Sequence, residues 1–266
     1  MTNIHPTAIV DPRAELDDSV EVGPWSIIEA GVQVGAGTKV GPHCLLSSGT
    51  KLGERNTLTA YVSIGTPPQD VRYTNVESRV EIGDDNLFRE FTTVNRGTPK
   101  EELVTRVGSH NMFMTASHIG HDCNLGDHLI LTNCVLLAGH VHLGDYAVLS
   151  GFVGVNQFTT IGRMAYVGAA SRVMQDVPPF TKVAGDPAEV RMVNEVGMQR
   201  AGIPQTDIDE IKHVYRSIFR LGRSVVEEAH NLINDDSTMV RELAEFLLRK
   251  EAGRYGRYRE SLRGHR

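Results

Sequence analysis

An aliphatic residue recurs at every sixth position along most of this chain. The longest runs extend from Ile4 to Ile64 and from Val107 to Val173 without a miss, and a shorter one spans residues 82–94. The next residue is often glycine, and the fifth residue of each hexad is mostly small or β-branched. A period of six matches neither the 3.6-residue period of a helix nor the alternation of an ordinary strand. It indicates a short strand and a turn, repeated.

Three such hexads, 18 residues, form one triangular coil. The aliphatic side chain then points into the prism and the small fifth residue fills a corner, so that successive coils bury one continuous core. We therefore predict an all-β left-handed parallel β-helix built on hexapeptide repeats over residues 1–186.

The pattern changes to a helical one after Pro187. Apolar residues at three- and four-residue spacing follow Pro204, and the segment Ser224–Glu227 has the form of a capping box. A last amphipathic stretch lies around Leu243. We predict a C-terminal α-helical domain over residues 187–266 that also covers the open end of the prism.

Two segments interrupt the six-residue step, at about 67–79 and 98–106. The repeats on either side keep their own phase, so these residues must leave the prism as loops. Long loops on a rigid scaffold are favoured places for binding residues. We expect one or both loops to contribute to a functional site.

Composition limits the remaining possibilities. Hydrophobic residues make up 40% and charged residues 23%, as in ordinary globular proteins. The three cysteines lack zinc or disulfide-framework spacing. The N-terminus does not have the form of a secretory signal, and no apolar run approaches the ~18 residues of a membrane span. We expect a cytoplasmic protein with no transmembrane segment and no nucleic-acid partner.

The net charge of -6 is distributed unevenly. Residues 249–266 hold seven Lys and Arg side chains, from Arg249 to Arg266, against Glu251 and Glu260. Such a stretch is either a solvated helix end or a docking patch for an acidic partner.

Histidines cluster in the segment 116–124. His121 and Asp122 take the third and fourth positions of their hexad, at a turn, where we expect them exposed and pointing away from the prism. Residues 18 apart stack about 4.8 Å apart on adjacent coils, so Gly139 lies beside His121 and His140 beside Asp122.

Three interpretations of this cluster remain open. His121, oriented by Asp122, can act as a general base, with the Gly139 N–H stabilising an oxyanion. Alternatively, His118, His121 and His140 can bind zinc, as in β-helical carbonic anhydrases. The third interpretation is that the histidines are structural.

The off-repeat residues resemble those of a known family, the bacterial UDP-N-acetylglucosamine O-acyltransferases, which catalyse the first step of lipid A biosynthesis. The similarity covers essentially the whole chain. It is carried by the opening Ile4–Val10, by Gln69–Tyr73, by Asn95–Thr98, by His118–Cys123 and by Gln175–Pro179.

The resemblance implies transfer of a 3-hydroxyacyl chain from acyl carrier protein to the glucosamine 3-hydroxyl of UDP-GlcNAc, in a homotrimer that needs no metal or other cofactor. It implies His121 as general base, Asp122 as its orienting carboxylate and the Gly139 backbone as the oxyanion contact. It assigns substrate contacts to Asp70, Arg72, His118, His140, Asn156, Gln157, Asn194 and Arg200. The basic C-terminal stretch is the implied site for the carrier protein.

Four positions depart from the family pattern: Arg72, Asn156, Val196 and Ala201. Altered sugar contacts of this kind suit a 3-amino sugar nucleotide, which would give an amide product. Ala169 falls where the family has its acyl-length ruler, and alanine there implies a chain of intermediate length.

Overall fold

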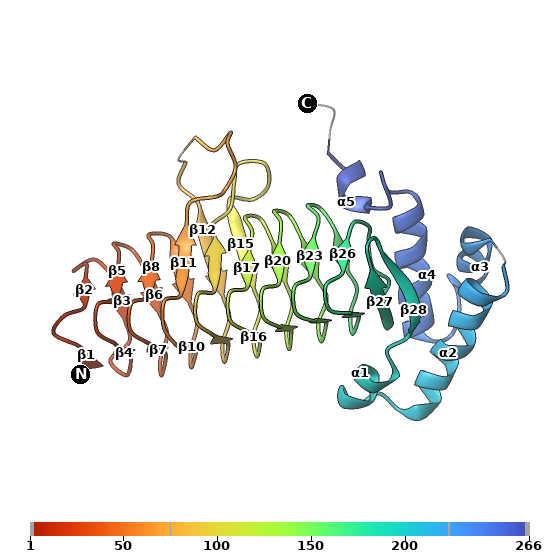
Figure 1. The fold of residues 1–266 in the computed structure, drawn as a ribbon, viewed down its shortest axis with the longest axis horizontal. Coiled ribbons are helices and arrows are strands. Elements are labelled where there is room, and N and C mark those ends of the chain that lie inside the picture. The colour runs from red at the N-terminus through yellow and green to blue at the C-terminus, as the bar shows by residue number, and fades with distance from the viewer. Residues whose placement is uncertain (1–2, 75, 223, 264–266) are drawn as a thin grey trace.

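Three parallel sheets, wound from one continuous chain, form the body of the molecule (Figure 1). The structure is a computed structural model that describes residues 3–74, 76–222 and 224–263. Successive strands enter the three sheets in turn up to β26 (Arg172–Val173), and strands one coil apart pair in parallel, as in His118 with Leu136. The predicted left-handed parallel β-helix is confirmed.

The sheets, named A, B and C, have the following strands. Sheet A contains β1 (Asn3–Ile4), β4 (Glu21–Val22), β7 (Lys39–Val40), β10 (Thr57–Leu58), β13 (Leu87–Phe88), β16 (Met112–Phe113), β19 (Ile130–Leu131), β22 (Val148–Leu149), β25 (Tyr166–Val167), β27 (Thr181–Gly185) and β28 (Ala188–Val193). Sheet B contains β2 (Ile9–Val10), β5 (Ile27–Ile28), β8 (Leu45–Leu46), β11 (Ser63–Thr66), β14 (Thr93–Asn95), β17 (His118–Ile119), β20 (Leu136–Leu137), β23 (Gly154–Val155) and β26 (Arg172–Val173). Sheet C contains β3 (Glu15–Leu16), β6 (Gln33–Val34), β9 (Thr50–Leu52), β12 (Arg79–Ile82), β15 (Val104–Val107), β18 (Asn124–Leu125), β21 (His142–Leu143) and β24 (Thr160–Ile161).

The interior of the prism is filled by the six-residue aliphatic series. Leu46, Leu131 and Leu137 are completely buried, whereas the residue before each of them points outward. Fifth-position residues such as Val62 and Val135 are also completely buried, at the corners. The positions that are aliphatic in the hexad pattern are therefore the positions whose side chains are buried.

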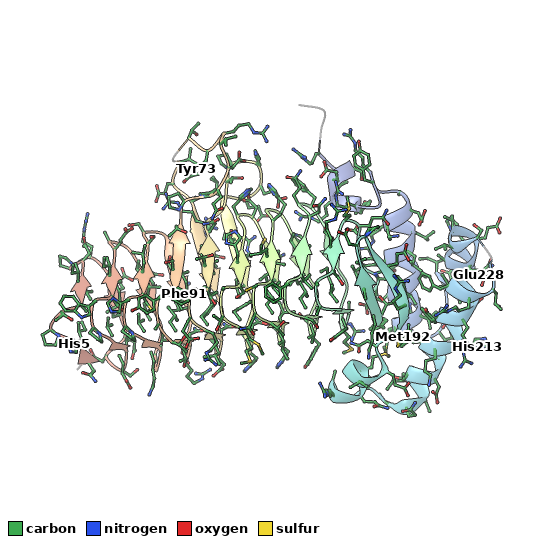
Figure 2. The ribbon with its side chains drawn as sticks, in the orientation of Figure 1. His5, Tyr73, Phe91, Met192, His213 and Glu228 are labelled. Atoms are coloured by element: carbon green, nitrogen blue, oxygen red, sulfur yellow. The ribbon has the colours of Figure 1, made fainter. Side chains whose placement is uncertain are left out.

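Two loops leave the prism where the step is broken. Residues 67–78 connect β11 to β12, and residues 96–103 connect β14 to β15. Both emerge at the corner between sheets B and C, on one side of the molecule (Figure 1). Tyr73 lies on the first loop, outside the coils (Figure 2), and its hydroxyl accepts a 3.2 Å hydrogen bond from Arg96 of the second. The two loops thus support each other.

The C-terminal region begins with the antiparallel hairpin of β27 and β28, and the expected domain boundary at residues 186/187 falls between its two strands. Five helices follow within the described part of the chain: α1 (Glu195–Arg200), α2 (Gln205–Arg220), α3 (Val225–Leu232), α4 (Thr238–Glu251) and α5 (Tyr258–Ser261). The short helices α1 and α5 were not predicted. The Ser224 side chain caps α3 by accepting from the Glu227 N–H, as the sequence indicated.

A second hydrophobic core lies among the helices and includes Met164 and Phe180 from the last coils. These two residues join the helices to the end of the prism, which the helices cover (Figure 1). Among the described residues, no helix has the length and apolar character required to cross a bilayer.

We predict that Leu52→Ala lowers the free energy of unfolding by about 2–5 kcal/mol, because it removes a buried side chain from a closely packed interior. Lys51→Ala is the matched control, since Lys51 precedes Leu52 in β9 and points into solvent. Denaturant unfolding measures both variants. Equal losses would contradict the inside–outside alternation of the strand.

Candidate active site

Both loops that interrupt the repeat lie at the corner between sheets B and C. The loops 67–78 and 96–103 leave there, and the turns 120–123 and 138–141 occupy the next two coils. Helix α5 lies on the same side of the prism (Figure 1). A rigid ladder of coils thus brings irregular segments from distant parts of the chain together.

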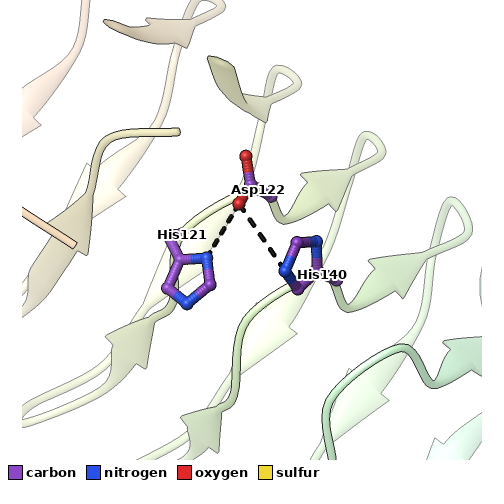
Figure 3. Close-up of side chains that lie close together, drawn as sticks. All are labelled: His121, Asp122 and His140. Carbon is purple, nitrogen blue, oxygen red and sulfur yellow. Dashed lines mark hydrogen bonds and ion pairs between the residues drawn. The ribbon is translucent and has the colours of Figure 1, made fainter. Parts of the chain in front are cut away.

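His121 and Asp122 form a hydrogen-bonded pair in the first of these turns (Figure 3). His121 Nδ1 lies 2.8 Å from Asp122 Oδ2, and a carboxylate can only accept, so Nδ1 carries the proton. This tautomer leaves Nε2 with a lone pair. Asp122 has a left-handed backbone (φ 58°), a conformation that aspartate tolerates better than most residues.

Asp122 is completely buried, which corrects the expectation of an exposed His–Asp pair. Its carboxylate accepts hydrogen bonds from the N–H (2.7 Å) and hydroxyl (2.6 Å) of Thr98 on the second loop. Only 12% of the His121 side chain is exposed. The turn does point away from the prism, but loop 96–103 folds over it and excludes water.

The ionisation of Asp122 follows from these contacts. Burial acts to raise the pKa of the carboxyl group, but the hydrogen bonds from His121 and Thr98 outweigh that effect, and the pKa lies below its ordinary value. Asp122 is therefore ionised at neutral pH and holds the imidazole in one orientation.

Gly139 lies directly against the imidazole ring, as the 18-residue step predicted. A Cβ atom at this position would lie 2.6 Å from His121 Nε2. Cβ atoms in proteins do not approach other heavy atoms that closely. Only glycine therefore allows the backbone of the next coil to approach the ring. Among the described residues, the Gly139 N–H makes no backbone hydrogen bond.

A cleft of about 800 Å³ opens beside His121 on the face of sheet B. This volume is within the usual range for a small-molecule site. Its polar lining includes Gln69, Thr93, Asn95, His118, His121, Asn156, Gln157 and Arg172. The structure thus brings the expected residues His118, His121, Gly139, Asn156 and Gln157 to one place.

His118 is held in the cleft by a 2.8 Å hydrogen bond between its Nδ1 and the Thr93 hydroxyl. Burial, and next the charge of His121, lower the pKa of His118 below its usual value. A neutral imidazole at this position can donate one hydrogen bond to a bound ligand or accept one from it.

The first loop carries Asp70 and Arg72, which do not line the cleft. Asp70 forms an ion pair with Lys100 of the second loop. The pKa of Asp70 is lowered to about 2, and the contact with Lys100 is the largest cause. Asp70 is not part of the cleft lining, to which this loop contributes Gln69. Arg72 is exposed beside a separate hollow that Lys100 also lines.

His140 lies behind Asp122 and does not line the cleft. Its Nε2 is 3.7 Å from Asp122 Oδ2 (Figure 3), and its Nδ1 is 3.0 Å from Glu101. The ligand-capable atoms of His121, Asp122 and His140 lie within 4.8 Å of one another. His118, which the zinc interpretation required, does not belong to this group among the described residues.

Three other expected site residues lie outside the cleft. Asn194 is buried and caps α1, with its side chain bonded to the Gly197 N–H and the Met164 carbonyl. A nucleotide contact would require that side chain to leave its cap. Arg200, on α1, and Ala169, at the corner between sheets A and B, are exposed.

The sequence assigned no individual role to Thr98, Glu101 or Arg259. In the structure Thr98 bonds to Asp122, and Glu101 and Arg259 both contact His140. The break in the repeat located the loop that carries Thr98 and Glu101, but it contained no signal for what the loop contacts. Arg259 was one of several cations in a basic stretch, whose last residue, Arg266, lies outside the described residues.

A hexapeptide β-helix with a buried His–Asp pair beside a cleft defines the class of β-helical acyltransferases. The chain belongs, within that class, to the UDP-N-acetylglucosamine O-acyltransferase family. The model of the second domain of this family matches residues 176–255. The acyl-[acyl-carrier-protein]–UDP-N-acetylglucosamine O-acyltransferase of Thiobacillus denitrificans is 48% identical over 95% of this chain and 99% of its own, and that of Aliarcobacter butzleri is 46% identical over 95% and 98%.

Solved structures agree with this assignment. UDP-N-acetylglucosamine acyltransferase from Francisella novicida superposes with a TM-score of 0.88 at 36% identity, over 91% of this chain and 90% of its own. The enzyme from Campylobacter jejuni gives 0.87 at 33% identity, over 92% and 95%. The resemblance found in the sequence is confirmed.

We predict that Asp122→Asn destabilises the fold most at neutral pH. The folded-state pKa of Asp122 is depressed, so its carboxylate contributes stability above the unfolded pKa of ~3.9 and loses that contribution as pH falls through the folded value. The difference in melting temperature from the unsubstituted protein should therefore shrink between pH 7 and pH 3. The exposed Asp236→Asn should show little difference at any pH, and a constant deficit for Asp122→Asn would contradict the prediction.

Proposed function

We propose that this chain transfers a 3-hydroxyacyl group from acyl carrier protein to the 3-hydroxyl of UDP-GlcNAc, the first step of lipid A synthesis. The observation that carries the proposal is the His121–Asp122 pair at the edge of the cleft, with the Gly139 backbone against the ring. The relatives from Thiobacillus denitrificans and Aliarcobacter butzleri are named for this activity.

His121 is the general base in this proposal. Its Nε2 removes the proton from the sugar 3-hydroxyl, and the oxygen attacks the thioester carbonyl. Asp122 keeps the proton on Nδ1 and stabilises the imidazolium that forms. As the tetrahedral intermediate collapses, the C–S bond breaks and the imidazolium returns its proton to the thiolate of the carrier.

The Gly139 N–H is the group that we assign to the oxyanion. It lies on the coil adjacent to His121 and makes no backbone hydrogen bond among the described residues. A donor that is already fixed in the fold needs no reorganisation when charge develops on the carbonyl oxygen.

The other residues proposed to contact the substrate fall into two groups, those that line the cleft and those that lie outside it. His118, Asn156 and Gln157 line the cleft and can contact the sugar nucleotide directly. Asp70 and Arg72 lie on the first loop outside the cleft lining, Arg72 beside the separate hollow, and can contact only parts of the substrate that extend beyond the cleft. His140 acts on the acceptor only through Asp122, and Asn194 and Arg200 can reach a ligand in the cleft only from another copy of the chain.

A homotrimer is the assembly that we propose. Four exposed aromatic residues line the corner between sheets A and B: Trp25, Tyr61, Phe91 and Phe152. The outward residues of sheet C, by contrast, are polar: Glu15, Gln33, Lys51, Glu81, Arg106 and Asn124. An apolar corner that faces a three-fold axis would be covered by two neighbours, leaving sheet C in water. The cleft on sheet B would then lie between two copies.

The direct experiment is an acyl-transfer assay with a panel of 3-hydroxyacyl carrier proteins. UDP-GlcNAc and its 3-amino analogue are offered as acceptors. Ester formation on UDP-GlcNAc is the expected result. Transfer to the amino analogue alone, or to neither acceptor, would overturn the proposal.

We predict that His121→Ala lowers kcat by about 10²–10⁴-fold, the usual contribution of a general base. The melting temperature should fall, because the buried Asp122 carboxylate loses one hydrogen bond but keeps the two from Thr98, and the sedimentation mass should remain three times the 29.3 kDa of one chain. His128→Ala is the matched control, because His128 stacks on Tyr146 at the corner between sheets C and A. Near-full activity of His121→Ala would refute its role as base.

We also predict that Ala169→Met shifts the preference of the enzyme towards shorter acyl chains, because a bulkier side chain shortens the space for the end of the chain. The carrier-protein panel measures the shift. Ala252→Met, at the exposed end of α4, should leave the profile unchanged. A wild-type profile for Ala169→Met would rule out a ruler at this position.

A further inference from the structure

The C-terminal segment returns along the prism to the corner that carries the active site. The Arg257 guanidinium donates to the Met174 carbonyl at 2.8 Å, and the Tyr258 N–H donates to Asp176 at 2.8 Å. These two contacts fasten the start of α5 to the last coil. Arg259, the next residue, is thereby directed towards His140.

Arg259 bridges the two segments that surround His140. One guanidinium nitrogen donates to the His140 carbonyl, and the other donates to Glu101 Oε1 at 2.6 Å. The same Glu101 oxygen accepts from His140 Nδ1 at 3.0 Å. The Arg259 side chain is 16% exposed and that of Glu101 is 29% exposed, so the contact lies at the edge of a hollow and is only partly screened by solvent.

The His140 ring has packing and polar partners on several sides. It stacks on Phe158 with ring centroids 4.1 Å apart and meets His121 edge-on at 5.0 Å. Glu101 fixes the proton on Nδ1, because a carboxylate can only accept. The opposite nitrogen, Nε2, lies 3.7 Å from Asp122 Oδ2, where it pairs with the carboxylate when both ring nitrogens carry a proton.

Glu101 remains a carboxylate in this position. Burial acts to raise its pKa, but the His140 hydrogen bond and the Arg259 charge outweigh burial, and the pKa is lower than usual. The contacts form a continuous series: Arg259, Glu101, His140, Asp122 and His121. Neither Arg259 nor Glu101 lines the cleft beside His121.

We propose that Glu101 and Arg259 are positioning residues for acyl transfer. They hold the His140 ring against Asp122, and Asp122 in turn keeps His121 aligned for proton abstraction. The C-terminal segment thus completes the active site of its own chain without touching the substrate. This inference rests on the function proposed above.

Steady-state acyl transfer to UDP-GlcNAc tests the proposal with Glu101→Ala, Arg259→Ala and the double variant. Each single change should lower kcat about 10–100-fold, the usual effect of losing a partially buried, charge-assisted hydrogen bond. The KM for UDP-GlcNAc should change less than about two-fold, because the substrate contacts remain. The double variant should be about as slow as either single one, since both residues act through one ring.

Glu101→Gln distinguishes positioning from general support of the fold. Its amide oxygen can still accept from His140 Nδ1, so it should recover most of the kcat that Glu101→Ala loses. Glu102→Ala is the matched control: Glu102 lies in the same loop, is largely exposed and pairs with Arg106 at 2.7 Å. It should retain the wild-type kcat.

The proposal is overturned if Glu101→Ala keeps the wild-type kcat, if its loss appears only in KM, or if Glu101→Gln is as slow as Glu101→Ala. The comparison of the two Glu101 variants decides the matter even if Arg259→Ala does not fold. Absence of acyl transfer by the unsubstituted protein would instead refute the proposed function itself.

Discussion

Each interior strand of this β-helix is held by backbone hydrogen bonds to the coils before and after it. Most strands are only two residues long, so none can be stable without its neighbours. The 18-residue register is therefore a constraint on the whole prism. Aliphatic side chains must recur every six residues to fill the interior, and any additional residues must leave at a corner.

The active site makes use of this constraint. The ladder places the His121 turn against the next coil, where the His140 N–H donates to the His121 carbonyl at 2.8 Å. Gly139 is brought against the imidazole by the same register. The rigid part of the site is thus a property of the repeat, and it requires no movement to form.

The loops outside the repeat supply the hydrogen bonds that stabilise the buried Asp122 carboxylate. Loop 96–103 buries Asp122 with the two hydrogen bonds of Thr98, and the loop is braced by the Lys100–Asp70 ion pair. A buried carboxylate is costly unless it is bonded on several sides. Thr98 and His121 provide those bonds, so the charge that orients His121 depends on a loop outside the hexad pattern.

The sequence by itself determined the fold, the corner at which His121 lies and its stacking on Gly139, because all three follow from a backbone period that repeats regardless of side-chain detail. It also located both loops as breaks in that period. Only the tertiary structure decided that Asp122 is buried, that Asp70 turns to Lys100, that Asn194 caps a helix and that Arg259 reaches Glu101. Those contacts join segments that share no period, and Arg259 and Glu101 are 158 residues apart in the chain. Their meeting depends on the path of the folded chain, which no local pattern encodes.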